Sequence, residues 1–179
     1  MQLDHNRQNI TEKIVTVYQE CDISTYPIDC FAILEHYGFR VLSYYDLKMK
    51  KQRLYEICKM FSDEAFRYKN TIAYNDNKPV SRIRFSLMHE LGHYILKHEG
   101  EKQENEQEAD CFASNILAPR VVIHKMGLRT SDQIHQFFGL SYEASNRALW
   151  DYRQWFFEKA QTTHQLSQAE EQLCKQITG

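Results

Sequence analysis

The segment SRIRFSLMHELGHYILKHEG, from Ser81 to Gly100, carries a helical pattern and a metal-binding motif together. Its apolar residues repeat every four positions, at Ile83, Leu87, Leu91 and Ile95. This period predicts an amphipathic helix with one buried stripe. Ser81 can cap the start of the helix and Gly100 can end it. Gly92 lacks a side chain, so the backbone of another element can pass close by.

Within this helix, His89, Glu90 and His93 form the motif H-E-x-x-H. The two histidines lie one helical turn apart on the same face, so both imidazoles can bind one metal ion, for which we predict zinc. Glu90 lies about 100° round the helix from His89, where it can accept a proton from a water molecule that the metal activates. The motif therefore predicts a metal site with Glu90 as general base. A pair of surface histidines on an ordinary helix is the alternative explanation.

Composition limits the class of protein. Hydrophobic residues make up 42% and charged residues 26% of the 179 residues, as in globular proteins that are not embedded in a membrane. No apolar run approaches the roughly 18 residues that a membrane span needs, and MQLDHNRQNITEK at the N-terminus lacks the apolar core of a secretory signal. Five widely spaced cysteines without a C-x-x-C pair favour reduced thiols. We therefore predict a cytoplasmic protein without a membrane partner.

The chain before residue 81 alternates helical and strand patterns. The patterns predict helices over residues 9–21, 27–38 and 46–60, a strand over 39–45, and one or two short strands over 66–75. Asn9 and Glu12 have capping-box spacing, and Pro27 suits a first helical turn. Together these patterns predict an α+β fold that is mostly helical, with a small sheet of three to four strands.

A catalytic zinc needs a third protein ligand, and EKQENEQEADCFASNILAP, residues 101–119, offers candidates. His98 follows His93 by too few residues for the three-histidine pattern of other zinc peptidases. Glu108 is possible. Glu106 and Asp110 lie four residues apart on one helix face, so the first can bind the metal while the second orients a ligand imidazole. We therefore predict Glu106 as the ligand and Asp110 as its partner; the alternative is a solvated acidic run.

Several segments together resemble the ImmA/IrrE family of zinc metallopeptidases: RIRFSLMHELGHYILKH, EQEADCFASNILAP, PIDCFAILEHYGFRVLSYY and TIAYND. The resemblance covers residues from about 10 to 120. It implies a zincin-like fold, one Zn²⁺ per chain bound by His89, His93 and Glu106, and Glu90 as catalytic acid and base. Asp110 departs from the asparagine that is common at this position.

This resemblance also implies a function. Members of the family are intracellular, are often encoded on phages and mobile elements, and cleave a helix-turn-helix repressor. In zinc peptidases with H-E-x-x-H, a strand beside the catalytic helix can hold an extended substrate at the sheet edge, and we assign residues 70–75 to this strand. The oxyanion donor stays open among the many tyrosines and histidines, including His124, His135 and Tyr142.

The C-terminal third predicts helices over residues 130–138 and 142–160 with a glycine turn between them, a weak helix-turn-helix pattern. Between Arg120 and Ala160 there are six Lys or Arg residues and four Asp or Glu residues. The segment is therefore not strongly basic, and we do not expect direct nucleic-acid binding. We likewise interpret the basic cluster over residues 48–53 as solvated charge.

The predicted division is a peptidase domain over 1–123, a helical extension over 124–160 and a polar tail or short helix over 161–179. The alternative function is a non-proteolytic zinc-binding module that binds a repressor or DNA through the C-terminal helices.

Overall fold

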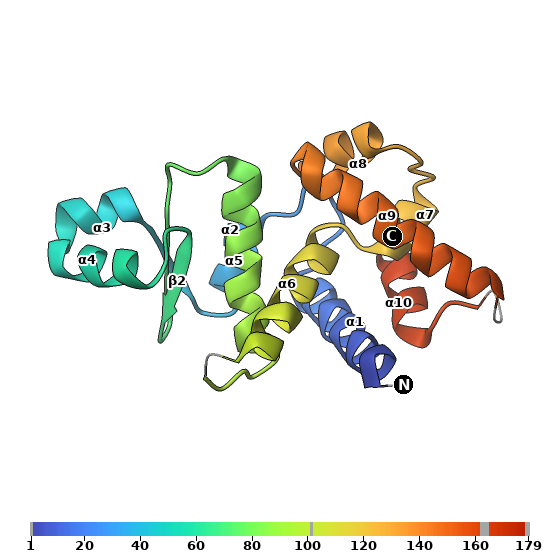
Figure 1. Cartoon of the computed structure of the whole chain (residues 1–179), viewed down its shortest axis with the longest axis horizontal. Helices are drawn as coiled ribbons and strands as arrows, with labels where there is room; N and C mark the ends of the chain where they lie inside the picture. The colour runs from blue at the N-terminus through green and yellow to red at the C-terminus, as the bar shows by residue number, and fades with distance from the viewer. Residues whose placement is uncertain (1, 101, 162–164, 178–179) are drawn as a thin grey trace. The chain divides into compact units, whose positions relative to one another are not determined.

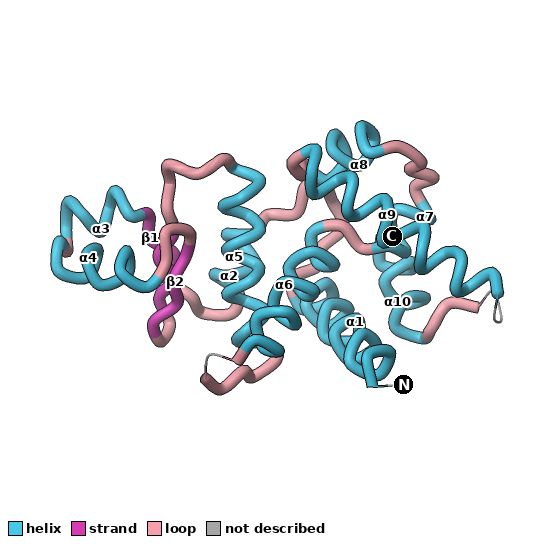
Figure 2. The backbone as a smooth tube through the Cα atoms, in the orientation of Figure 1, coloured by secondary structure: helices cyan, strands magenta, loops and turns pink. Residues whose placement is uncertain are grey.

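The computed structural model describes residues 2–100, 102–161 and 165–177 and contains two compact units. One unit comprises residues 29–113, and the other comprises residues 1–28 together with 114–179. Helix α6 (Gln103–Leu117) crosses the boundary between them. Figures 1 and 2 show the elements of both units. Among the described helices, none combines the length and the apolar character that crossing a bilayer requires.

The unit of residues 29–113 surrounds the H-E-x-x-H helix. Before α6 it contains α2 (Cys30–His36), β1 (Arg40–Ser43), α3 (Tyr44–Lys50), α4 (Gln52–Phe61), β2 (Ala65–Tyr68), β3 (Thr71–Tyr74) and α5 (Val80–Ile95). The strands form one sheet in the order β1-β3-β2, in which β3 is parallel to β1 and antiparallel to β2. A mostly helical α+β fold with a small mixed sheet is thereby confirmed.

The position of β3 in the sheet corrects one prediction. Residues 70–75 were assigned to the strand that holds an extended substrate, but β3 pairs with β1 on one side and with β2 on the other. Its backbone groups are used within the sheet, so a peptide cannot pair with it. Strand β2, next to β3, lies at one edge of the sheet and packs against α5. The turn between them contains Lys69 with a positive φ of 53°.

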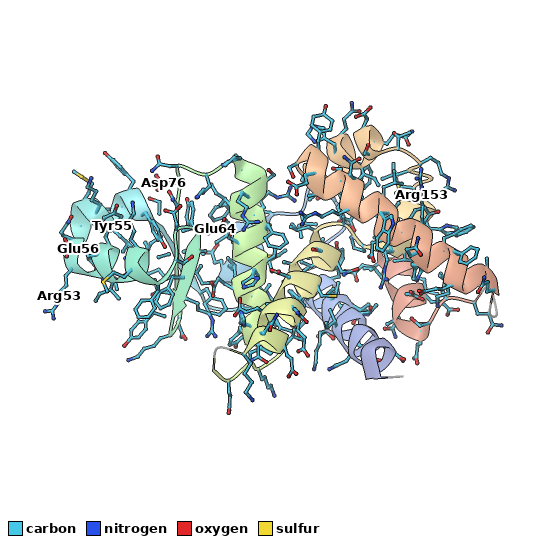
Figure 3. All side chains as sticks on the ribbon, in the orientation of Figure 1. Arg53, Tyr55, Glu56, Glu64, Asp76 and Arg153 are labelled. Atoms are coloured by element: carbon cyan, nitrogen blue, oxygen red, sulfur yellow. The ribbon has the colours of Figure 1, made fainter. Side chains whose placement is uncertain are left out.

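A helical hairpin connects β1 to β2 where one helix was predicted over residues 46–60. The helix breaks at Lys51, whose φ of −149° and ψ of 61° are not helical. The two halves, α3 and α4, fold back on each other over a small core of Tyr44, Leu47, Cys58 and Ala73. The basic residues of the hairpin are exposed, as predicted, and Arg53 points outward in Figure 3.

In its described residues, the second unit contains helices and no strand. It contains α1 (Gln2–Glu20), the end of α6, α7 (Arg120–Lys125), α8 (Ser131–Phe138), α9 (Tyr142–Gln161) and α10 (Gln168–Gln176). The hydroxyl of Tyr18 donates to the carbonyl of Ile116 at 2.8 Å, which ties α1 to α6. The indole N–H of Trp155 donates to Glu170 at 2.7 Å, which ties α9 to α10. Both predicted C-terminal helices and the capping box at Thr130 are confirmed.

Three predicted helix starts are wrong. Asn9 lies inside α1, which is already helical from Gln2. Helix α2 begins at Cys30, because the Asp29 side chain caps it by accepting hydrogen bonds from the amides of Phe31 and Ala32. Pro27 follows a cis peptide bond outside the helix. Helix α5 begins directly after Pro79, one residue before Ser81. The predicted domain boundaries at residues 123 and 160 remain predictions. Residues 162–164 and 178–179 of the predicted tail lie outside the described residues.

Candidate metal centre

Helix α5 places His89 and His93 side by side. Their ring centroids are 4.7 Å apart, and the two Nε2 atoms are 3.0 Å apart. The opposite face of the helix anchors it, because Leu87, Met88 and Leu91 are fully buried. Of the stripe that the sequence predicts, Leu87 and Leu91 are buried, while Ile83 and Ile95 are half-buried. The buried face of the helix therefore fixes the direction in which both imidazoles point.

Helix α6 brings Glu106 to the two imidazoles. The carboxylate oxygens of Glu106 lie 3.3 Å from Nε2 of His89 and 3.3 Å from Nε2 of His93. In the described part of the chain, these three residues are the group whose donor atoms lie within 4.8 Å of one another. The structure thus brings together the three side chains that the sequence predicts as ligands, although it does not test their role.

The close approach of α5 and α6 depends on Gly92. A Cβ added there would lie 3.1 Å from Cδ1 of Phe112 and 3.2 Å from Cα of Ala109, closer than most real Cβ contacts. Because Ala109 contributes a backbone atom, this contact cannot be relieved by a rotamer change alone. The absence of a side chain at Gly92 therefore sets the distance between the histidines on α5 and Glu106 on α6.

A substitution tests this dependence. We expect Gly92→Val to lower the free energy of unfolding by about 1–3 kcal/mol, the usual cost of overpacking, and to weaken zinc binding because α6 must move away. Gly92→Ala should lie closer to wild type, since it is smaller and gains helix propensity. Denaturant titration and zinc competition measure the two effects. A Gly92→Val variant with wild-type stability and zinc affinity would contradict this account.

The outer nitrogens of both imidazoles have partners. Nδ1 of His89 lies 2.8 Å from Oδ1 of Asp110, the pair that the sequence predicts. Nδ1 of His93 lies 3.0 Å from Nδ1 of His98, and Nε2 of His98 lies 2.9 Å from the carboxylate of Glu108. From the sequence, we considered His98 and Glu108 only as candidate ligands and did not predict this contact.

The residues fit a cation on chemical grounds. Since Asp110 accepts the Nδ1–H of His89, a neutral His89 has its lone pair on Nε2, facing Nε2 of His93 and the Glu106 carboxylate. If Nε2 of His93 also carries its lone pair, three acceptors face one another there, an arrangement that only a proton or a metal ion stabilises. Two imidazoles and a carboxylate are a donor set that catalytic zinc sites use, with a further position left for water or substrate.

The pKa values of the two histidines shift in opposite directions. Burial alone would lower the pKa of His89, but the hydrogen bond to Asp110 and the nearby carboxylates outweigh it and raise that pKa above its usual value. Burial and the neighbouring His89 lower the pKa of His93 below its usual range. The lowered pKa favours the neutral form of His93, which is the form that binds a metal.

Glu90 lies beside this group without belonging to it. Its carboxyl is largely buried, and burial raises its pKa to about 7 even though His89 and Arg67 act in the opposite direction. The backbone N–H of Arg67 on β2 donates to it. A metal ion nearby would favour the ionised form. A carboxyl group whose pKa is near 7 can both accept and donate a proton at neutral pH, as general acid and base catalysis requires.

These groups line a cleft of about 780 Å³. Strand β2 and the segment before it form one wall, and α5 and α6 form the others; the lining includes Glu64, Arg67, Phe85, Glu90 and Asp110. Figure 3 labels Glu64, whose carboxylate accepts a hydrogen bond from Ser86 of α5 at 2.9 Å. Nε of Arg67 is buried and has no hydrogen-bond partner among the described residues.

A comparison with family models identifies the chain's relatives. The model of the IrrE N-terminal-like domain, Peptidase_M78, matches residues 36–149. The chain belongs to this family. No curated protein and no solved structure matches it. The match covers β2, α5 and α6, which carry the cleft, so the M78 membership and the geometry of the cleft both point to a metallopeptidase. The resemblance to the ImmA/IrrE family is thereby confirmed.

Proposed function

We propose that the protein is a zinc-dependent endopeptidase, of the type with H-E-x-x-H and a glutamate ligand, that hydrolyses one peptide bond in a regulatory protein. The observation that supports this most directly is the convergence of His89, His93 and Glu106 beside the buried carboxyl of Glu90 in one cleft. A structural zinc site would have four protein ligands and no cleft. A catalytic site needs the open position that a cleft provides.

The chain's own residues can carry out the proton transfers. When bound, the metal ion supplies Lewis acidity, which polarises a carbonyl group and acidifies a water molecule. Glu90 accepts a proton from the attacking water at its carboxylate and donates it to the nitrogen of the leaving amine. Asp110 holds the ring of His89 through Nδ1 and so keeps its Nε2 directed toward Glu106.

The edge strand β2 is our candidate for holding the substrate. The carbonyl of Glu64 accepts from the amide of Asn75 at 2.7 Å, so by alternation Glu64, Phe66 and Tyr68 bond toward β3. The backbone N–H and C=O groups of Ala65 and Arg67 then point to the outer edge of the sheet, where the backbone N–H of Arg67 donates to Glu90. An extended polypeptide paired with this edge would lie along the cleft, which is the usual way in which a sheet edge binds peptides.

The substrate class follows from the family resemblance. We propose a helix-turn-helix transcriptional repressor of a phage or mobile element as the substrate. The five free cysteines fit a reducing compartment, so we place the protein in the cytoplasm. These assignments go beyond membership of the peptidase family.

A cleavage assay tests the proposal. The purified protein, loaded with zinc, is incubated with the repressor that is encoded next to it, and the products are measured by mass spectrometry. We expect one discrete cut, which a zinc chelator abolishes and added zinc restores. A repressor that is bound but stays intact at every metal concentration would overturn the peptidase assignment and favour a binding module.

A further inference from the structure

His98 follows helix α5, which carries the two predicted histidine ligands. It is the least exposed of the three clustered imidazoles. Its side chain is 6% exposed, against 15% for His93 and 18% for His89. Both of its ring nitrogens have partners, Nδ1 with His93 and Nε2 with Glu108. A buried histidine with both nitrogens engaged is fixed in position.

A left-handed residue after α5 brings His98 to this position. Helix α5 ends at Ile95, and Lys97 has a positive φ of 56°. Residues other than glycine, asparagine and aspartate rarely adopt this left-handed conformation. It turns the chain back, so that the amide of His98 donates to the carbonyl of His93 at 3.0 Å. Together with the bond from the amide of Lys97 to the carbonyl of Tyr94 at 3.2 Å, this is a common C-terminal cap in which the residue after the helix is left-handed.

The hydrogen bonds between these side chains can run in only one direction when His98 is neutral. The carboxylate of Glu108 only accepts, so Nε2 of His98 must donate to it. A neutral imidazole carries one N–H, which leaves a lone pair on Nδ1 of His98. That lone pair accepts the Nδ1–H of His93. The remaining lone pair of His93 is then on Nε2, which faces His89 and Glu106.

We propose that His98 and Glu108 are positioning residues that fix the metal-binding tautomer and ring orientation of His93. Asp110 contacts His89 directly, whereas Glu108 acts on His93 through the ring of His98. The difference follows from α6: Glu108 lies about 200° round the helix from Glu106, away from the face that Glu106 and Asp110 share. His98 bridges the gap, so each histidine ligand has its own carboxylate behind it.

This inference rests on the proposed metal site, and its first test measures zinc affinity. We expect His98→Ala and Glu108→Ala to weaken zinc binding by about 10–100-fold, as losses of such outer partners usually do. His98→Asn should retain part of the affinity, because its Oδ1 can take the place of Nδ1 and accept from His93. Competition with a chelating indicator gives the affinities. The matched control is Glu104→Ala, which removes the same charge from an exposed position on α6.

A second readout follows the tautomer itself. In the zinc-free protein, ¹⁵N NMR of the histidine rings should show His93 protonated on Nδ1, and His98→Ala should produce a mixture of tautomers. If His98→Ala folds poorly, Glu108→Ala tests the same chain of hydrogen bonds, since alanine cannot accept from Nε2 of His98. The positioning role is overturned if His98→Ala and Glu108→Ala bind zinc within about twofold of wild type, or if Glu104→Ala weakens binding equally. Zinc binding that depends on His98 in a protein without peptidase activity would overturn the proposed function alone.

Discussion

Glu90→Gln is expected to lose peptide cleavage by about 10²–10⁴-fold, the usual contribution of general acid and base catalysis, while it keeps its metal and its fold. Glutamine has nearly the same shape as glutamate, so the buried position beside Arg67 stays filled. An amide cannot accept the proton of the attacking water. Since Glu90 is outside the group of His89, His93 and Glu106, zinc affinity should be nearly unchanged. Product formation and zinc content, measured on the same preparation, check both parts.

Asp110→Asn is the graded comparison for this variant. It keeps an oxygen that can accept from Nδ1 of His89 but removes the charge, so a milder loss of about 10–100-fold is expected.

The opposite outcome identifies the binding module. In this outcome, cells with Glu90→Gln regulate repression as the wild type does, whereas cells with Trp150→Ala or Arg153→Ala, both exposed on α9, do not. The C-terminal helices then carry the function and the cleft does not.

Patterns with a short period made the centre of the site predictable. The apolar stripe of α5, the spacing of His89 and His93, and the spacing of Glu106 and Asp110 all depend on residues within one or two helical turns. The donor atoms of all four side chains lie where these spacings suggest. The close passage of a second backbone at Gly92 was also predictable, because a glycine inside a strong helical pattern usually has a packing reason.

Helix starts and the role of each strand depended on information that lies elsewhere in the chain. A capping residue such as Asn9 or Ser81 is a one-residue signal, and it is overridden when the chain before it can continue the helix or when a proline, here Pro79, precedes it. Whether β2 or β3 forms the sheet edge depends on β1, whose residues pair with residues of β3 that lie 31 positions later in the sequence, such as Arg40 with Thr71. A local pattern does not contain that pairing.

The contact between His93 and His98 shows the same limit at the site. The spacing of the two residues excluded a known ligand pattern but suggested no other role. Their contact requires the left-handed backbone at Lys97, for which a lysine gives no signal. The partner of His98, Glu108, is one of several glutamates in an acidic run, and only the direction in which α6 presents it distinguishes it from the others.

His89→Ala combined with His93→Ala is expected to abolish stoichiometric zinc binding, whereas the wild type should hold one zinc per chain. The double variant retains only Glu106, whose carboxylate is half exposed and cannot compete with water for a metal ion unaided. Metal analysis after dialysis against a weak chelator measures the stoichiometry. In the wild type, zinc at 100 times its dissociation constant should also stabilise the fold by about 2.7 kcal/mol, and this effect should vanish in the variant.

The control for this experiment is His36→Ala combined with His135→Ala, which removes two histidines outside the cleft. It should bind one zinc with unchanged affinity, because neither residue belongs to the group of donor atoms. Adventitious binding to histidines would instead fall by the same amount in both double variants. If the His89 and His93 double variant still holds one tightly bound zinc, the metal lies elsewhere, and both the peptidase mechanism and the positioning role of His98 lose their basis.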